Sequence, residues 1–256
     1  MNVKEQVVGK LQVNTYQNRG DLGTHAATLA AAQIIALQKD PQKIVRMIFA
    51  SAPSQSEFLA GLQANPMIDW SRIEAFHMDE YVGLATEHPQ SFGRFLQDNL
   101  FSEVPIGKVH FINGQAEDAQ AECERYAALL KEQPIDLVCM GIGENTHIAF
   151  NDPHVADFND PYLAKLVDLD EMSRQQQVND GCFPQMNDVP THAITLTVPA
   201  LMAGNSLYCM VPGPTKAQAV KTTLQAEVNP QVPSSILRTH PQAILFLDQE
   251  SAANIN

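Results

Sequence analysis

Several features that mark particular classes of protein are scarce or missing in this sequence. Only four cysteines occur among 256 residues, they lie far apart, and none forms a C-x-x-C pair. This pattern argues against a disulfide framework or a zinc site and favours reduced thiols in a cytoplasmic protein. No apolar run reaches the length of a membrane span, and the N-terminal residues lack the apolar segment of a signal peptide. We therefore expect no membrane partner and no secretion.

Basic residues are also in short supply. Lysine and arginine total 16 against 29 aspartates and glutamates, which gives a net charge of -13, and the basic residues form no cluster. A nucleic acid or an anionic membrane surface is therefore not an expected partner. A small anion is still compatible with this charge, because a helix N-terminus and one or two cations can bind a phosphate locally.

The size and composition are those of an ordinary globular protein. A chain of 256 residues suits one large α/β domain or two small ones, and an apolar fraction of 45% is sufficient for a sizeable core. No linker, internal repeat or low-complexity tract divides the chain. We therefore expect a single domain over residues 1–256.

Short apolar runs alternate with stretches of helical spacing along the chain. The apolar runs predict strands at 44–50, 72–77, 109–112, 135–139, 164–169, 193–198, 207–211 and 243–247. The helical spacing predicts helices at 21–38, 90–103, 117–132 and 214–226, and one that carries Phe58, Leu59 and Leu62. Asp21 and Ser54 are the expected N-caps of two of them. This alternation predicts an α/β protein with a doubly wound, mostly parallel, Rossmann-like sheet and helices on both faces. The polar stretches 151–162 and 176–191 are typical of lids or binding loops.

The loop after the strand at 135–139 has the richest chemistry. Gly141 and Gly143 allow a sharp turn and a close approach to a ligand, and Asn145, His147 and Asp152 follow. An imidazole can act as general acid and base near neutral pH, and a carboxylate can orient it. The alternative is a glycine turn with solvated polar residues, in which Asp152 only forms a turn before a proline. We favour a ligand site at this loop.

Other strand ends carry polar groups that would meet at the same edge of a parallel sheet. Asp79 and Glu80 are candidates for a general base, although a solvated acidic turn would have the same sequence. Lys216 follows a Pro-Gly-Pro-Thr segment in the first turn of a predicted helix, where a cation is unfavourable unless an anion lies beside it. His77 with Asp79 could suggest a metal, but His147 has no second histidine at ligand spacing, so we expect no metal site.

Three motifs give the chain a resemblance to a known family. The segments 76–84 (FHMDEYVGL), 141–153 (GIGENTHIAFNDP) and 213–217 (GPTKA) resemble signatures of the glucosamine-6-phosphate deaminase/isomerase family, which belongs to a superfamily with 6-phosphogluconolactonase. The similarity extends from the first helix to the last strand. It implies a Rossmann-like fold, no metal, no organic cofactor and a small sugar phosphate as partner. The implied reaction is an aldose–ketose proton shift on a hexosamine 6-phosphate with loss of ammonia, and the chain could form a homo-oligomer.

The resemblance also implies roles for individual residues. Asp79 is the implied base that moves a proton between C1 and C2, His147 assists ring opening, and Asp152 supports that histidine together with Asn145. The implied contacts to substrate or phosphate come from a larger set, namely Ser51, Ser54, Lys216, Arg174, Glu80 and Gly143. Arg174 is included because the family's phosphate-binding arginine falls near 172–180.

The chain departs from the family's usual pattern in three places, and one of them is Asp152, which is one methylene shorter than the usual glutamate. Asn145 and Thr146 stand where an acidic residue and a glycine are usual, and Asn145 can hold a hydrogen bond but supplies no charge. Ala52 and Pro53 stand where the phosphate loop carries two glycines, and a proline removes one N–H donor.

Two other functions remain open from the sequence. One is a 6-phosphogluconolactonase, a hydrolase on a related fold, although the HIAFN segment at 147–151 differs from the pattern expected of lactonases. The other is a sugar-phosphate-binding protein with little catalysis, an alternative suggested by Asn145. Deaminase/isomerase activity is the favoured interpretation of the three motifs.

Overall fold

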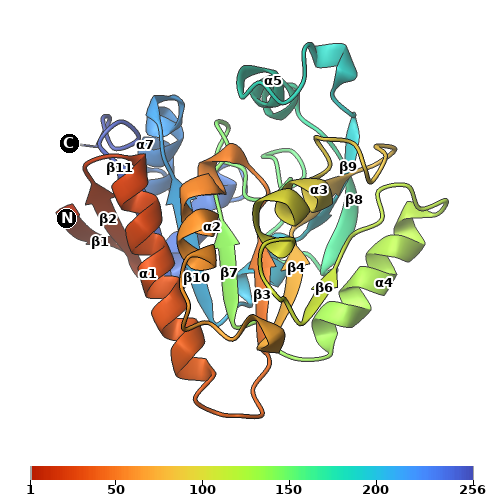
Figure 1. The fold of residues 1–256 in the computed structure, drawn as a ribbon. Helices are drawn as coiled ribbons and strands as arrows, with labels where there is room; N and C mark the ends of the chain where they lie inside the picture. The colour runs from red at the N-terminus through yellow and green to blue at the C-terminus, as the bar shows by residue number, and fades with distance from the viewer. Residues whose placement is uncertain (1, 256) are drawn as a thin grey trace.

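The computed structural model describes residues 2–255, in which helices pack on both faces of a sheet of eight strands (Figure 1). The strands of this main sheet are β1 (Asn2–Val8), β2 (Leu11–Tyr16), β3 (Val45–Phe49), β4 (Ile73–His77), β6 (Lys108–His110), β7 (Leu137–Met140), β10 (Ser206–Val211) and β11 (Ala243–Asp248). Their spatial order is β1-β2-β11-β10-β7-β3-β4-β6. Neighbouring strands run parallel except β1 and β2 at one edge. The predicted α/β class and the mostly parallel, doubly wound sheet are confirmed.

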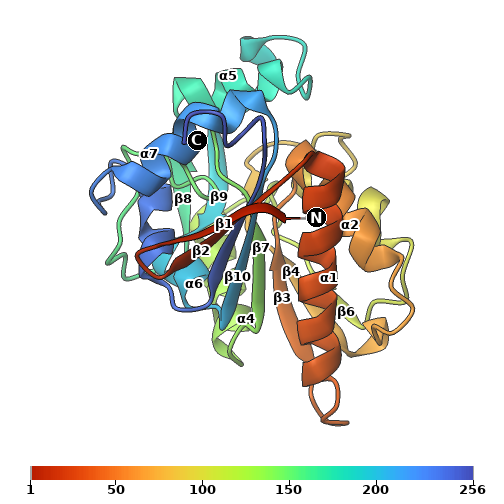
Figure 2. The same cartoon turned by 90° about the vertical axis from the view of Figure 1, so that its left-hand side faces the viewer.

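The helices lie in two layers. The α-helices are α1 (Arg19–Leu37), α2 (Ser56–Gln63), α3 (Phe92–Leu96), α4 (Ala119–Lys131), α5 (Glu171–Asn179), α6 (Val198–Met202) and α7 (Ala217–Gln225). Short 3-10 turns are η1 (Pro53–Gln55), η2 (Trp70–Arg72), η4 (Met186–Asp188), η5 (Pro214–Lys216) and η6 (Pro233–Thr239), and η3 (Gln97–Phe101) is a π-helical turn. Figure 2 shows α1 and α2 on one side of the sheet, α6 and α7 on the other, and α5 beyond one end of it.

A separate buried cluster fills each face of the sheet, because side chains of successive strand residues point to opposite faces. In β3, Met47 joins the cluster under α1 and α2, whereas Ile48 joins the cluster under α4, α6 and α7. The alanine-rich face of α1 lets α2 approach closely: a Cβ on Gly61 would lie 2.6 Å from the Cβ of Ala27. Helices thus cover both faces of the main sheet, so the ends of its strands are where a ligand site can form.

The order of the strands contains a switch point. From β3 the chain builds outward through β4 to β6, then returns to place β7 on the other side of β3 and builds outward through β10 and β11. Loops that leave the carboxyl ends of β3 and β7 therefore diverge from one another. In open α/β sheets the crevice at such a point is where ligands bind.

A second sheet has three antiparallel strands: β5 (Asp79–Tyr81), β9 (His192–Leu196) and β8 (Ala164–Asp168). We predicted the runs at 164–169 and 193–198 as part of the parallel sheet, and that expectation was wrong. A third buried cluster joins this sheet to α3 through Tyr81, Phe92 and Phe150. The small sheet therefore anchors both the segment after β4 and the loop after β7.

Several predicted boundaries also differ in the structure. Helix α1 begins at Arg19, and its N-cap is Asn18 rather than Asp21, because the Asn18 side chain accepts a hydrogen bond from the Asp21 N–H. Ser54 lies inside η1 and does not cap α2. Part of the predicted irregular stretch 176–191 belongs to α5 and η4. None of the described helices is long and apolar enough to cross a membrane.

Candidate functional site

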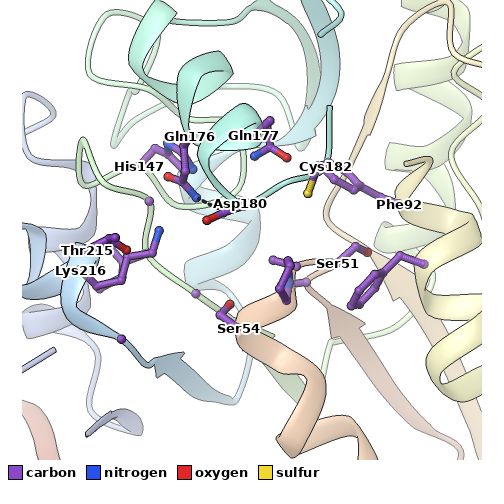
Figure 3. A pocket seen from close by; sticks show the side chains of 18 of the residues that line it. Ser51, Ser54, Phe92, His147, Gln176, Gln177, Asp180, Cys182, Thr215 and Lys216 are labelled. Atoms are coloured by element: carbon purple, nitrogen blue, oxygen red, sulfur yellow. Dashed lines mark hydrogen bonds between the residues drawn. The ribbon is translucent and has the colours of Figure 1, made fainter. Parts of the chain in front are cut away.

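A pocket of about 550 Å³ lies at the carboxyl ends of four adjacent strands, β4, β3, β7 and β10 (Figure 3). Six of the ten predicted site residues line it: Asp79 after β4, Ser51 and Ser54 after β3, Gly143 and His147 after β7, and Lys216 after β10. The strand order explains this convergence, since the four strands are neighbours across the switch point. Gln176, Gln177 and Asp180 from α5 and its end line the same pocket.

Asp79 places a buried carboxylate in the pocket. Its residue is 7% exposed, and the carboxylate has no hydrogen-bond or ion-pair partner among residues 2–255. Burial raises the pKa of Asp79 well above its usual range, and the neighbouring charge of Glu80 raises the pKa further. A carboxylate held this way is a stronger base than an exposed one, which suits proton abstraction.

The backbone of Asp79 is held in place by the side chain of His77. The His77 Nε2 accepts a hydrogen bond from the Ile112 N–H at 2.9 Å, so its Nδ1 carries the proton and donates to the Asp79 carbonyl at 2.8 Å. Burial lowers the pKa of His77, although Glu80 opposes this effect. Because both ring nitrogens are engaged, His77 is a structural residue and not a metal ligand.

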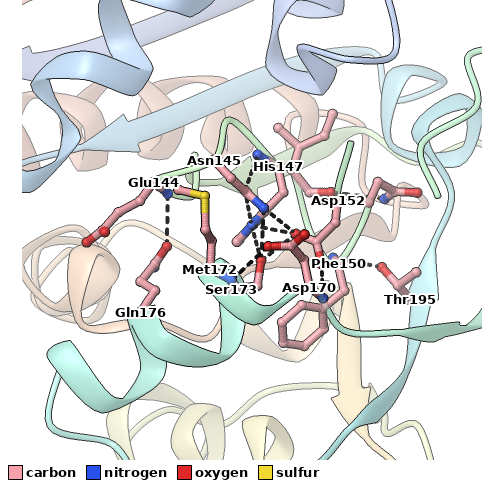
Figure 4. Close-up of polar contacts among 12 residues, drawn as sticks. Glu144, Asn145, His147, Phe150, Asp152, Asp170, Met172, Ser173, Gln176 and Thr195 are labelled. Carbon is pink, nitrogen blue, oxygen red and sulfur yellow. Dashed lines mark hydrogen bonds and ion pairs between the residues drawn. The ribbon is translucent and has the colours of Figure 1, made fainter. Parts of the chain in front are cut away.

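His147 is held by acceptors on one side of its ring (Figure 4). Its Nδ1 lies 2.7 Å from the Oδ1 of Asn145 and 3.0 Å from the Oδ1 of Asp152. The Asn145 amide must turn its Nδ2 toward Asp152, to which it donates at 2.9 Å, so its Oδ1 faces the imidazole. Nδ1 therefore carries a proton, and Nε2, which has no partner in the described chain, is available as an acceptor.

Asp152 is the charged member of this cluster and is fully buried. Burial alone would raise its pKa, but the hydrogen bond and charge of His147 and the donors on Asn145 and Ser173 hold the pKa well below its ordinary value. Its other oxygen accepts a hydrogen bond from the Asp170 N–H at 3.1 Å. Among the described residues Asp152 is therefore the one carboxylate in direct contact with the imidazole, because Asn145 presents an amide oxygen.

The backbone of the loop is shaped around this histidine. The ring packs on Gly143, where an added Cβ would come within 2.1–2.4 Å of three ring atoms, so no other residue fits. Thr146 has φ +72°, a left-handed conformation that is unfavourable for a β-branched residue. The resemblance implies a glycine at this position, and glycine adopts a positive φ without strain.

Lys216 is the buried cation of the pocket. Its residue is 7% exposed, and no carboxylate lies within 4 Å of its Nζ in the part of the chain that the structure describes. Burial lowers the pKa of Lys216, while the charges of Asp180 and Glu144 oppose that shift. An anion bound beside the ammonium group would supply the missing partner.

The loop after β3 faces Lys216 across the pocket (Figure 3). The Ser51 hydroxyl is buried and has no partner within the described residues, and Ser54 lines the pocket beside it. Pro53 occupies the first position of η1, where its missing N–H would have had no helical partner. The proline therefore fits the helical turn without cost, but it removes an N–H that would have been free to bind an anion.

Two predicted contact residues do not reach the pocket. Glu80 follows Asp79 on β5 and so points to the opposite side; its carboxylate accepts hydrogen bonds from the Phe92 and Gly93 N–H groups at the start of α3. Arg174 donates to the carbonyls of Met186 and Val189 and does not line the pocket. Ser173 faces His147, and the next residue of a helix turns about 100° away.

Three other residues at this site were not predicted from the sequence. Ser173 lies at the His147 cluster, Arg19 lines the pocket from the start of α1, and Cys182 lines it after α5. Arg19 is engaged with Glu57 and with the Pro53 carbonyl. A helix predicted from the Asp170 N-cap would have placed Ser173 and Gln176 on one face, but the stretch has no apolar periodicity that marks a helix.

Comparison with known proteins identifies the family. A family model described as glucosamine-6-phosphate isomerases/6-phosphogluconolactonase matches residues 18–246. The chain belongs to this family. A relative named glucosamine-6-phosphate deaminase from Bacillus cereus is 39% identical over 184 residues, which are 72% of this chain and 68% of that protein. Another of the same name from Exiguobacterium is 37% identical over 186 residues, or 73% of this chain and 71% of that one.

Solved structures of the family show the same fold. A structure described as a monomeric glucosamine-6-phosphate deaminase has a TM-score of 0.86 and 26% identity, and the match covers 94% of this chain and 99% of that one. A 6-phosphogluconolactonase from Thermotoga maritima has a TM-score of 0.75 and 19% identity over 93% and 99% of the two chains. The second likeness is one of fold alone.

Proposed function

We propose that this protein is an aldose–ketose isomerase and deaminase that converts a hexosamine 6-phosphate, such as glucosamine 6-phosphate, to the ketose phosphate and ammonia. The observation that carries the proposal is the pairing, in one pocket, of a buried carboxylate and a histidine Nε2, neither of which has a partner among residues 2–255. The names of the curated relatives support the same activity.

Binding begins with the phosphate. Lys216 supplies a desolvated ammonium group, and the hydroxyls of Ser51 and Ser54 are donors on the facing loop. A phosphate here would restore the partner that burial has taken from Lys216, and the rest of the sugar would extend toward Asp79 and His147. Energy from this remote group can be used to position the reacting carbons.

Ring opening comes next and uses His147. Its Nε2 accepts the proton of the anomeric hydroxyl, and the protonated ring then donates a proton to the ring oxygen as the bond from C1 to that oxygen breaks. Asp152 stabilises the transient imidazolium through Nδ1, to which it lies at 3.0 Å. The product of this step is the open-chain aldehyde.

The isomerisation uses Asp79. Its carboxylate removes the proton from C2, the electron pair forms a C1–C2 double bond, and the C1 oxygen is protonated. Return of a proton to C1 leaves an iminium group at C2. Water adds to C2 and ammonia leaves, so the overall deamination consumes one water and is formally hydrolytic.

We place this activity in one domain and in the cytoplasm. The four cysteines are free thiols, three of them buried, which suits a reducing compartment. The two buried clusters on the main sheet each draw residues from both halves of the chain, which favours a single folding unit over residues 1–256.

The test is turnover on candidate substrates with the purified protein. Glucosamine 6-phosphate and galactosamine 6-phosphate are each incubated with the protein, and released ammonia and ketose phosphate are measured. We expect both products in equal amounts from at least one epimer. Hydrolysis of 6-phosphogluconolactone without ammonia release from either amino sugar would refute the proposal, as would saturable binding of the sugar phosphates without turnover.

A further inference from the structure

Ser173 is a buried hydroxyl in the middle of the His147 cluster (Figure 4). Its residue is 1% exposed, and its Oγ lies 2.8 Å from the Nδ1 of His147. The same Oγ donates a short hydrogen bond to the Oδ1 of Asp152 and accepts one from the Asn145 Nδ2 at 3.3 Å. Ser173 does not line the pocket, so it has no direct contact with a substrate bound there.

The count of protons in the cluster fixes the direction of these bonds. A serine hydroxyl has one proton, and Asp152 as a carboxylate can only accept, so the Ser173 proton lies on the bond to Asp152. Toward His147 the Ser173 oxygen is therefore an acceptor. The imidazole N–H, the hydroxyl and the carboxylate form a chain in addition to the direct contact between His147 and Asp152.

Helix α5 delivers Ser173 to this place through two further bonds. The N-cap residue Asp170 donates its N–H to Asp152, and Gln176, one turn after Ser173, accepts a hydrogen bond from the Glu144 N–H at 2.9 Å. The spacing of three residues puts Ser173 and Gln176 on one face of the helix. The first turns of α5 are thus docked on the loop that carries His147.

From these contacts we propose that Ser173 is a positioning residue for the ring-opening step. Its hydroxyl couples the imidazole to the carboxylate and joins the oxygens of Asn145 and Asp152 in holding the proton on Nδ1. It thereby helps to keep the Nε2 of His147 as the acceptor for the substrate. This inference rests on the proposed function. It matters more in this chain than where an acidic residue stands at 145, because the amide of Asn145 cannot provide a second charged acceptor.

The first experiment compares Ser173→Ala with Ser173→Thr and with the matched control Ser206→Ala. Ser206 is a buried serine at the start of β10, where its hydroxyl accepts a hydrogen bond from Gln33 and has no part in the pocket. We expect kcat to fall about tenfold in Ser173→Ala, as for loss of one hydrogen bond to a charged group. KM should stay within about twofold, because the hydroxyl does not touch substrate. Ser173→Thr should restore kcat, and Ser206→Ala should leave it unchanged.

The second experiment needs no turnover. The ¹⁵N shifts of His147 are recorded in the substrate-free protein and assigned by comparison with His147→Gln. Wild type should show the tautomer with the proton on Nδ1, and Ser173→Ala should shift toward a mixture. If the alanine variant does not fold, Ser173→Cys keeps a similar volume with a much weaker donor and acceptor.

The outcomes separate the two ideas. An unchanged tautomer in Ser173→Ala, with or without a fall in kcat, would make the serine a packing group and overturn the inference. A fall in kcat of the same size in Ser206→Ala would overturn it as well. If wild-type protein released no ammonia from either hexosamine phosphate, the proposed function would fail, yet the ¹⁵N shifts would still decide whether Ser173 controls the histidine.

Discussion

Replacing Asp79 by asparagine should remove activity and at the same time stabilise the substrate-free protein. The carboxylate is buried without a partner in the described part of the chain, and burial together with Glu80 raises its pKa well above the ordinary value. A carboxyl group whose native pKa is raised binds its proton more tightly in the folded state than in the unfolded one. Its contribution to stability is therefore complete below the unfolded pKa, about 3.9, and is lost as pH rises through the native pKa.

The size of the effect follows from the same linkage. The stability difference between Asp79→Asn and wild type should be near zero below about pH 4. It should grow by up to about 1.4 kcal/mol per pH unit above that, and level off at the native pKa of Asp79. In a protein of this size each 1 kcal/mol corresponds to about 2–4 °C in Tm. Activity should fall by about 10²- to 10⁴-fold, the usual contribution of a general base.

The assay is a series of denaturant or thermal unfolding curves between pH 4 and pH 8, with ammonia release measured on the same samples. Asp98→Asn is the matched control: its carboxylate is half-exposed and paired with Arg94 four residues away, so its removal should change stability by less than about 0.5 kcal/mol. Asp152→Asn should show the opposite sign. The pKa of Asp152 is held low by its partners, so its contribution is present above about pH 4 and is lost as pH falls through the lower native pKa.

Two results would refute this reasoning. If Asp79→Asn were no more stable than wild type at any pH, the carboxylate would have a partner in solution that the structure does not contain. If the variant still exchanged the C2 proton of a hexosamine phosphate with solvent at the wild-type rate, Asp79 would not be the base. The first result concerns the environment of the residue and the second its chemistry, so they can be judged separately.

Three further predictions concern the pocket and its loop. Lys216→Met should raise KM and weaken inhibition by inorganic phosphate by roughly tenfold or more. It should also raise the Tm of the substrate-free protein, because the buried ammonium group is desolvated. Unchanged phosphate inhibition would exclude Lys216 as the phosphate contact. Asn145→Asp should destabilise the protein at neutral pH by roughly 1–3 kcal/mol, because it replaces a donor 2.9 Å from the Asp152 carboxylate by a like charge. Unfolding curves should show that this loss of unfolding free energy becomes smaller toward acid pH. Thr146→Gly should stabilise by about 1 kcal/mol, since φ is +72° there; a lower Tm would show that the threonine side chain contributes more than its backbone strain removes.

The parts of the fold that depend on local pattern were predictable from sequence. The fully buried run Val45–Phe49 and the helix that follows it could be read from apolar spacing and length. The small second sheet could not. Its strand β8 reads as one more apolar run, yet Leu166 is 44% exposed and β8 pairs antiparallel with β9. Only the tertiary pairing of β5 with β9 distinguishes this sheet from an extension of the parallel one.

The same distinction applies to the pocket. Residues that directly follow a strand, such as Asp79, could be placed because the end of the strand places them. Arg174 could not, since one step along α5 turns a side chain from the His147 cluster to the carbonyls of Met186 and Val189. The contact of Ser173 with the His147 cluster could not be predicted for the same reason. It depends on where α5 docks, and neither composition nor periodicity encodes that docking.

The two edges of the main sheet show what identifies a site. A second cavity of about 540 Å³ lies at the amino ends of the strands and is lined by charged residues, among them Arg46. There the buried charge is matched: the Arg46 guanidinium, 2% exposed, bonds Glu74 at 2.7 Å and also donates to backbone carbonyls of the 129–133 segment.

At the carboxyl edge the balance is different. Asp79 and Lys216, each 7% exposed, and the buried Ser51 hydroxyl have no partners among residues 2–255. Burying unpaired polar groups costs free energy, so a fold that keeps three of them facing one pocket gains from a ligand that pairs with all three. The hexosamine phosphate proposed above would bring a phosphate to the cation and the hydroxyl, and an acidic C–H to the base. The two cavities have nearly the same volume, and the buried polar groups without partners distinguish the candidate site from the other cavity.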